Sequence, residues 1–371
     1  MMRRVFSALP DRMRMFFMAP VLPPTALALR SREIVVVEVR QRRGRLFVRR
    51  AAVEPLGEGV LEPAFEGKNV RAREPLLRAL ERAREKAGVR YARRWAVTLP
   101  SATCRVFLLE LEDAPKAKDE LASMIAWKIE RLVGISASEL TIAVQRFPLR
   151  RQRASSNASS SEREVVAQGE RFLAVAARTD VLSAYEELLV EAGLHPGFIV
   201  PNNLAESGWM ATLPSDEDAV LISVEGDWLT LFFTRRREPL AVRAIHCEPG
   251  AMLDEIHRTL VYYQDRLSRL ERELKSPSVE STSSEAAPSS PVIERSARLR
   301  TIVVVHHNEE MGGTPSSLAR EIESLCAALF STEAAPTVYC LNEHALEQES
   351  NWRLSQLAAP LGIIASSRMR G

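Results

Sequence analysis

Apolar residues near the start of the chain come in two short runs, at 27–29 and 34–39, separated by four polar residues, 30–33. The second run is rich in β-branched residues. This pattern predicts two antiparallel strands joined by a tight turn. Such turns usually contain Gly, Asn or Asp, because some turn positions need a positive φ. A turn that reads Arg-Ser-Arg-Glu is therefore unusual.

The same order of predicted elements occurs twice. Each copy has a three-stranded meander, then a helix and one more strand. The first copy has strands at 27–31, 33–41 and 45–53, a helix at 73–87 and a strand at 93–100. The second copy has strands at 219–225, 228–234 and 240–247, a helix at 251–274 and a strand at 301–307. The copies share little identity, so this is a repeat of architecture.

A further unit separates the copies. Strands are predicted at 103–113, 141–147 and 171–178, and helices at 118–134 and 180–192. In the first helix an apolar stripe, Leu121, Ile125, Ile129 and Leu132, has the spacing of one buried face. Strands that alternate with helices in this way predict an α/β fold with mixed sheets.

Two Ser-rich segments with almost no large apolar residues, 150–164 and 275–294, predict mobile loops. The chain is therefore divided into five parts. These are an N-terminal arm (1–24), the first part of a first subdomain (25–102), a small inserted subdomain (103–178, with a loop at 150–168), a return to the first subdomain (179–210) and a second domain (211–371, with a loop at 275–296).

Charge and cysteine content exclude several classes of function. The 50 basic residues nearly balance the 48 acidic ones among 371, so no overall field favours nucleic acid. The four cysteines lack metal-binding or disulfide-framework spacing and predict a reducing compartment. The arginines and apolar residues of 1–24 leave three alternatives open, namely a signal peptide, a membrane-surface arm or a disordered tail.

No catalytic or metal-binding constellation is evident. His306 and His307 are adjacent in a predicted strand, where their side chains point to opposite faces, so they are not expected to chelate one metal. His246 beside Cys247 is interpreted as packing rather than as a catalytic pair. Neither a metal site nor a catalytic residue is predicted.

Several segments, in order, carry a resemblance to a known family. They read WAVTLPSATCRVFLLEL, DELASMIAWKIERLVGISASEL, FLAVAARTDVLSAYEELLVEAGLHPGFIVPNNLAESG, EIHRTLVYYQ and LAAPLGIIAS. Their order and spacing resemble the PilM family of type IV pilus assembly proteins, well over residues 25–275 and more weakly over 298–367. The resemblance implies an actin-like ATPase fold, which is two duplicated ribonuclease-H-like domains with mixed sheets and a small inserted subdomain.

In that family, glycines and an aspartate in three loops hold a nucleotide. Here the positions of the first loop's aspartate and glycine fall at Ala28 and Arg30. In the second loop Ser223 and Glu225 replace them, and in the third the glycines come several residues late. The degenerate nucleotide positions are Ala28, Arg30, Ser31, Arg32, Ser223, Glu225, Gly226, Asp227, Gly312 and Gly313. The resemblance therefore implies a fold kept without ATP hydrolysis, and no ATP or Mg²⁺ cofactor is expected.

The family's function implies a cytoplasmic scaffold, peripheral to the inner membrane, of a type IV pilus or a related type II secretion platform. Its partner would be the N-terminal cytoplasmic peptide of a PilN-like membrane protein, with the pilus motor ATPases and the platform protein as further candidates. The alternative from another class is an active actin-like ATPase or a sugar kinase, and a third is a basic nucleic-acid binder, which the balanced charge does not favour.

Two features give candidate surfaces. Trp127 points off the apolar stripe of its helix, near Arg131, which is typical of a second packing partner or a binding surface. By analogy with the family, the peptide groove would combine these two residues with Leu99, Pro100, Ser101 and Ala102. An arginine cluster, Arg40, Arg42, Arg43, Arg45, Arg49 and Arg50, spans a predicted hairpin and indicates either a solvated edge protected from aggregation or a membrane-facing surface.

Overall fold

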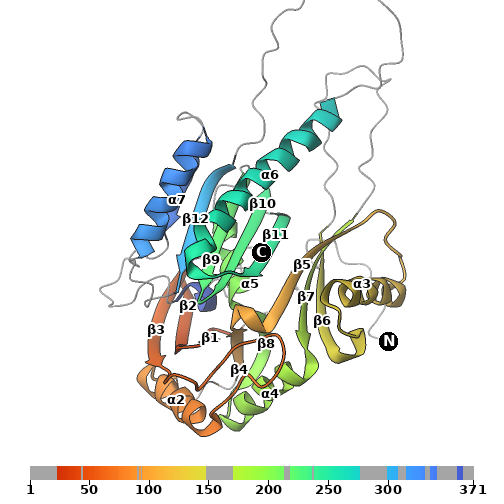
Figure 1. Cartoon of the computed structure of the whole chain (residues 1–371). Helices are drawn as coiled ribbons and strands as arrows, with labels where there is room; N and C mark the ends of the chain where they lie inside the picture. Colours follow the sequence, from red (N-terminus) through yellow and green to blue (C-terminus); the bar gives the residue numbers. More distant parts are fainter. Residues whose placement is uncertain are drawn as a thin grey trace, which may run out of the picture.

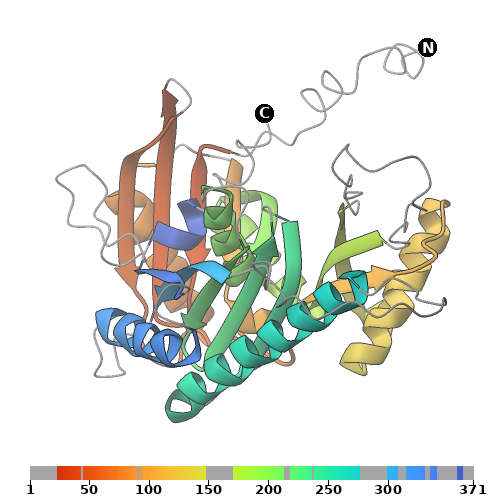
Figure 2. The same ribbon diagram turned by 90° about the horizontal axis from the view of Figure 1, so that it is seen from above.

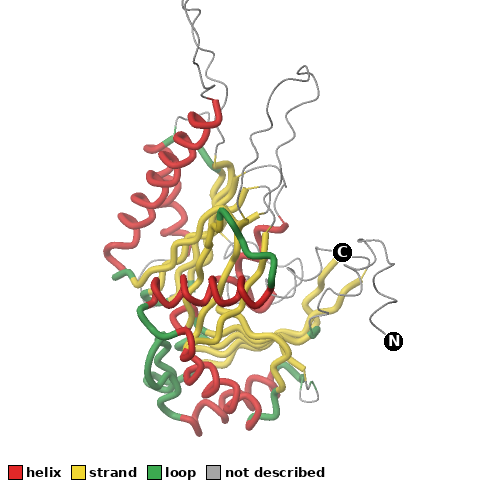
Figure 3. The backbone as a smooth tube through the Cα atoms, turned by 90° about the vertical axis from the view of Figure 1, so that its right-hand side faces the viewer, coloured by secondary structure: helices red, strands yellow, loops and turns green. Residues whose placement is uncertain are grey.

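The computed structural model describes residues 23–42, 45–89, 92, 94–147, 170–212, 218–235, 238–275, 299–307, 315–330, 335–340 and 357–361. These residues form two lobes, each built on a five-stranded sheet, and a three-stranded sheet beside them (Figure 1). Helices lie on the outside of the two lobes, and the strands lie between them (Figure 3).

The first lobe contains the strands β1 (Thr25–Leu29), β2 (Glu33–Arg42), β3 (Arg45–Pro55), β4 (Arg94–Leu99) and β8 (His195–Pro201), in the order β3-β2-β1-β4-β8. The first three strands are antiparallel, and β1, β4 and β8 are parallel. Helices α2 (Arg73–Lys86) and α4 (Thr179–Glu191) cover one face of this sheet. They bury Leu76, Leu80, Tyr185 and Leu188 against it.

The second lobe repeats this plan. Its strands are β9 (Asp218–Glu225), β10 (Trp228–Arg235), β11 (Glu238–His246), β12 (Leu299–His306) and β13 (Thr337–Cys340), in the order β11-β10-β9-β12-β13. The directions match strand for strand, with an antiparallel meander followed by two parallel strands. Helices α6 (Met252–Lys275) and α7 (Pro315–Leu329) cover the outer face. The predicted duplication is confirmed.

The third sheet has the order β5-β7-β6 and comprises β5 (Cys104–Leu111), β6 (Leu140–Phe147) and β7 (Glu170–Arg178), all antiparallel. Helix α3 (Lys118–Val133) covers one face with Ile125 and Ile129. Viewed from above, this unit projects to one side of the lobes (Figure 2). This unit lies within residues 103–178, for which the sequence predicted a small inserted subdomain.

A shared core joins the inner faces of the two lobes. It contains Val35 and Val37 of β2, Leu221 of β9, Val303 of β12 and the short helix at 357–361. Because both sheets contribute to one apolar layer, the lobes are packed against each other directly. The side chains at the open end of this layer form the candidate site described below.

Some features differ from the predictions. Strand β8 was not predicted, because its sequence HPGFIVP has two prolines and no clear alternation of buried and exposed residues. Leu132 was assigned to the buried stripe of α3 but is 60% exposed, since it lies in the last turn of the helix, where nothing covers it. The two Ser-rich loops and the arm up to residue 22 lie outside the described residues.

Candidate functional site

The turn between β1 and β2 lies where the two lobes meet. Arg30 N donates a hydrogen bond to Glu33 O at 3.0 Å, which closes the turn. The Arg30 side chain is only 3% exposed and forms an ion pair with the carboxylate of Glu33. The Arg30 side chain therefore points inward, whereas Arg32 is exposed.

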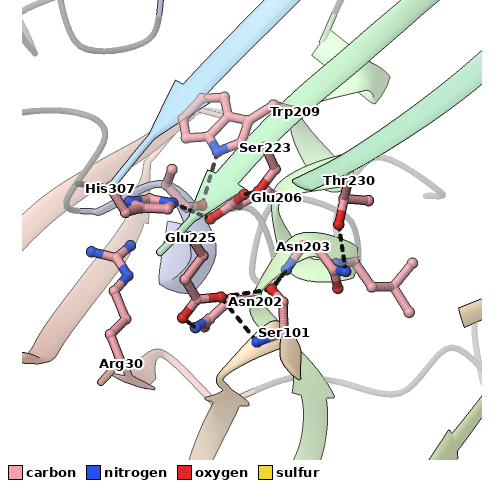
Figure 4. Close-up of polar contacts among 12 residues, drawn as sticks. Arg30, Ser101, Asn202, Asn203, Glu206, Trp209, Ser223, Glu225, Thr230 and His307 are labelled. Carbon is pink, nitrogen blue, oxygen red and sulfur yellow. Dashed lines mark hydrogen bonds and ion pairs between the residues drawn. The ribbon is translucent and has the colours of Figure 1, made fainter. Parts of the chain in front are cut away.

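The corresponding turn of the second lobe, between β9 and β10, carries Glu225 (Figure 4). Its Oε2 accepts hydrogen bonds from Ser101 N at 2.9 Å and from Ser101 Oγ at 2.6 Å. Its Oε1 accepts one from Asn202 Nδ2 at 2.8 Å, and the same amide donates to Leu29 O at 2.9 Å. Glu225 thus joins the second lobe to the ends of β1, β4 and β8 in the first.

A second buried carboxylate lies on α5 (Asn202–Glu206), the short helix that follows β8. Glu206 Oε1 lies 2.5 Å from His307 Nε2, and Glu206 Oε2 accepts a hydrogen bond from Ser223 Oγ at 2.6 Å. Glu206 is fully buried. A buried carboxylate is costly unless its oxygens are paired, and here each oxygen has a partner from the second lobe.

Asn203 makes a further contact between the lobes, since its Nδ2 donates to Thr230 Oγ1 at 2.9 Å. Its backbone N donates to Ser101 Oγ at 3.1 Å within the first lobe. We call the following set the interlobe network: Ser101, Asn202, Asn203, Glu206, Ser223, Glu225, Thr230 and His307. Figure 4 shows these side chains pointing toward one another from both lobes.

The remaining predicted nucleotide positions lie in or beside these two turns, or outside the described residues. Ala28 is buried within β1, and Ser31 is half-buried in the first turn. Gly226 has a φ of 59° in the second turn, beside exposed Asp227. Gly312 and Gly313 lie outside the described residues. At the two turns that are described, Glu225 bears a carboxylate and Arg30 forms an ion pair with Glu33.

Trp228 follows the second turn and packs on a cation. The guanidinium carbon of Arg105 lies 4.7 Å from the Trp228 ring centroid and 4.4 Å from that of Phe65. Burial lowers the pKa of Arg105, with the charge of Glu66 acting in the opposite direction. This stack ties β5, β10 and the loop that contains Phe65 together, a role that sequence reasoning did not find for Arg105.

Several network residues were also missed. Asn202, Asn203 and Glu206 lie in the run PNNLAE, where polar residues follow an apolar stretch and read as surface positions. All three are buried. In the sequence, these three polar residues stood out only because they lie close together within a segment that resembles the PilM family.

Burial perturbs the pKa of two groups near the site. The pKa of His306 falls to about 4, because burial disfavours the charged ring and because His307 is adjacent. The pKa of the Cys104 thiol rises to about 11 through burial. A thiol that stays protonated at neutral pH is a poor nucleophile. The described residues contain no group of three His, Cys, Asp or Glu side chains placed to hold a metal ion.

The face of α3 presents a second candidate surface. Trp127 is 54% exposed, and the guanidinium carbon of Arg131 lies 5.1 Å from its ring centroid. The other half of the predicted groove does not join them. Leu99, Pro100 and Ser101 are buried, Ala102 is half-buried, and Figures 1 and 2 both place α3 across the third sheet from the end of β4. The structure therefore does not join these six residues in one exposed surface; the peptide groove stays a prediction, and the α3 face is its exposed part.

None of the helices in the described part of the chain combines the length and the apolar character needed to cross a bilayer. All four cysteines are buried and reduced.

Comparisons with known proteins place the fold. No model of a protein family matches the chain, and no curated protein matches it. Among solved structures, a chain of the "PilM-PilN type IV pilus biogenesis complex" is similar, with a TM-score of 0.59, 16% identity, and coverage of 95% of this chain and 99% of that one.

Two further similar structures have lower scores. One is the cytoplasmic domain of EpsL, an inner membrane component of the type II secretion system of Vibrio cholerae, with a TM-score of 0.41, 11% identity, and coverage of 90% of this chain and 92% of that one. The other is a Bacteroides thetaiotaomicron protein with an actin-like ATPase fold, with a TM-score of 0.42, 8% identity, and coverage of 86% and 90%. The predicted fold is confirmed: the chain has the duplicated, actin-like α/β architecture found in the PilM-PilN structure.

Proposed function

We propose that this chain is a scaffold protein of a type IV pilus, or a related type II secretion, assembly platform. It works at the cytoplasmic face of the inner membrane and binds the N-terminal cytoplasmic peptide of a PilN-like membrane protein. The pilus motor ATPases and the platform protein are further candidate partners.

One observation carries this proposal. The similarity to a chain of the PilM-PilN complex extends over 95% of this chain and 99% of the other, so both lobes and the third sheet have counterparts. Folds alone do not determine function, which depends on sites. The exposed α3 face and the largely buried interlobe network support binding in place of catalysis.

The interlobe network supports a role without ATP hydrolysis. ATPases of this architecture hold phosphates with backbone N–H groups and a metal held by an aspartate. Here the corresponding turn offers Glu225, whose two oxygens accept three hydrogen bonds from Ser101 and Asn202. A triphosphate would have to displace these bonds and approach a carboxylate, both of which cost free energy.

The α3 face supports peptide capture. An exposed tryptophan with an arginine stacked on it supplies an apolar anchor and a charge, the residue types most often found at binding hot spots. Strand β6 beside it is the outer strand of the third sheet and pairs on one side with β7. An extended peptide could add to the other side of β6 by backbone hydrogen bonds while its side chains contact Trp127.

Calorimetric titration tests the proposal. Synthetic N-terminal peptides of membrane proteins encoded beside this gene are titrated into the full chain, into Trp127→Ala and into Tyr262→Ala. Tyr262 is a matched control, because it is an exposed aromatic residue on α6 of the second lobe. We expect the peptide of a PilN-like protein to bind, Trp127→Ala to weaken it at least about tenfold, and Tyr262→Ala to bind as the parent does. No binding by any such peptide would overturn the proposal.

The alternative function is an active actin-like ATPase or sugar kinase. The same titrations with Mg-ATP separate the two, since an enzyme of this class must bind nucleotide and release phosphate. Turnover that is lost in Glu225→Ala but kept in Trp127→Ala would favour the enzyme.

A further inference from the structure

The hairpin of β2 and β3 extends beyond the sheet to which it belongs. Thr25, the first residue of β1, pairs with Glu38, so β2 continues for four residues with no β1 residue beside it. Strand β3 accompanies it, and the last pair is Arg42 with Arg45. Figure 2 shows this hairpin projecting past the other strands of the first lobe. We call the stretch of residues 38–50 the basic hairpin; the structure describes its residues 38–42 and 45–50.

The basic hairpin is the most strongly charged stretch of an otherwise balanced chain. It contains six arginines and one glutamate, whereas the whole chain has a net charge of only +2. Arg40, Arg49 and Arg50 are exposed. Among the described residues here, Glu38 is the carboxylate that pairs with them, at 3.0 Å from Arg49 and 3.7 Å from Arg50. One carboxylate cannot neutralise this number of guanidinium groups, so the hairpin keeps a large positive charge.

An exposed aromatic side chain lies within this charge. Phe47 is the cross-strand partner of Arg40, and it is 41% exposed. Cross-strand partners share one face of a hairpin. The face therefore combines a phenyl ring with guanidinium groups. Arg94 lies near its base, where it lines a shallow depression together with Glu38 and Arg50.

This combination fits an anionic phospholipid bilayer better than the other anionic partners. Arginines close to an anionic leaflet each gain about 1 kcal/mol, and an apolar ring can enter the boundary of the acyl chains. A projecting two-stranded hairpin is convex, so it can meet a flat surface. Such a ribbon also fits the major groove of a duplex, but the nearly balanced charge of the whole chain supplies no field that would favour nucleic acid. Binding to single strands also relies on several aromatic stacking platforms, and Phe47 is the one aromatic residue in the stretch.

We propose that the basic hairpin is a membrane-docking surface that binds anionic phospholipid head groups through Arg40, Arg49 and Arg50 and inserts Phe47 at the interface. This goes beyond the proposed function, because direct contact with lipid needs no partner peptide. It would hold the protein at the leaflet in the absence of the membrane partner.

Vesicle flotation tests the proposal. The full chain is mixed with vesicles of phosphatidylcholine alone, or with about 30% phosphatidylglycerol, at about 0.15 M salt. We expect binding to the anionic vesicles only, reduced at least about tenfold in Arg40→Glu/Arg49→Glu and severalfold in Phe47→Ala, and weaker at high salt. Arg258→Glu/Arg320→Glu makes the same change of net charge on α6 and α7, where both arginines are exposed, and should bind as the parent does.

Several outcomes would overturn the proposal. These are equal binding to both kinds of vesicle, equal loss in the two double variants, and loss only on deletion of residues 1–22, which hold four arginines of their own. A short oligonucleotide, added at the same total negative charge as the anionic vesicles, could also prevent binding to them completely. That result would assign the hairpin to nucleic acid instead. Phe47→Ala leaves the charge unchanged, so it tests the apolar contact even if a charge-reversed variant fails to fold. Because none of these measurements includes the partner peptide, failure here leaves the proposed function standing.

Discussion

Glu225 of the second lobe accepts two hydrogen bonds from Ser101 of the first lobe, one from its backbone N at 2.9 Å and one from its hydroxyl at 2.6 Å. The two residues are separated by 124 positions in the chain. In the fold they join the end of β9 in the second lobe to the segment that follows β4 in the first.

Removal of the Glu225 carboxylate should destabilise the protein. In Glu225→Ala the buried N–H and hydroxyl of Ser101 lose their acceptor, and the free energy of unfolding should fall by about 2 kcal/mol. Urea denaturation measures this change. Asp227→Ala is the control, because Asp227 lies in the same turn and is exposed, so it should change the free energy by less than about 0.5 kcal/mol. Equal effects of the two variants would show that the contact between the lobes contributes nothing.

The pair of Glu206 and His307 should behave as one unit. His307→Ala leaves a buried carboxylate with a single partner, Ser223, and should lower the free energy of unfolding by about 3 kcal/mol. Replacing both members, in Glu206→Gln/His307→Ala, should cost less than the sum of the single changes. A double-mutant cycle by urea denaturation measures the coupling, which we expect to exceed about 1 kcal/mol. Additive single effects would contradict it.

Nucleotide should leave the thermal stability unchanged. A ligand present at about 100 times its Kd stabilises a protein by about 2.7 kcal/mol, which raises the Tm by several degrees. Because Arg30 and Glu225 are engaged with protein partners, we expect no rise of the Tm with Mg-ATP in differential scanning fluorimetry. A rise that depends on ATP concentration would contradict the prediction and favour the alternative enzyme.

His306 should make stability depend on pH. Its pKa is about 4 in the folded protein and about 6.5 in the unfolded chain, so the unfolded state takes up a proton first as the pH falls. The free energy of unfolding should therefore be highest above about pH 6.5 and decrease between about pH 6.5 and 4, by roughly 3 kcal/mol at most. Denaturation at several pH values checks this.

The control for this pH dependence is the replacement of an exposed histidine. His306→Gln should reduce the slope in that window, and His195→Gln, at the start of β8, should preserve it. If the two variants follow the same pH profile, the dependence does not come from His306.

Trp127 should matter little for stability even though it is large. With more than half of its surface exposed, Trp127→Ala should change the free energy of unfolding by less than about 1 kcal/mol. Ile129→Ala, two residues along α3 and fully buried, should cost about 3 kcal/mol. Thermal denaturation of both variants measures the difference. A large loss in Trp127→Ala would mean that this ring packs inside the protein and is unavailable to a peptide.

Part of this site could be predicted from the sequence. The changes at Arg30, Ser223 and Glu225 were identified through the resemblance to the PilM family, whose loops carry glycine or aspartate at these positions. The burial of Arg30 could not be predicted, since a charged residue in a turn is usually exposed, and the ion pair with Glu33 is what stabilises it. The partners of Glu225 could not be predicted, because no local pattern relates it to Ser101 or Asn202.

The sequence by itself determined the two three-stranded meanders, the helix and strand that follow each of them, and their duplication. The spacing of apolar residues reports which face of a strand or helix is buried, and this is a local property that reads the same in both lobes. It also determined where the charge gathers, in the basic hairpin. The tertiary structure alone decided which polar side chains meet, because Ser101, Glu206, Glu225 and His307 come together only when the two sheets share a core. The hydrogen bonds between Ser101 and Glu225 and between Glu206 and His307 join residues more than 100 positions apart, so they depend on that packing. The side chains that they join lie between the two lobes.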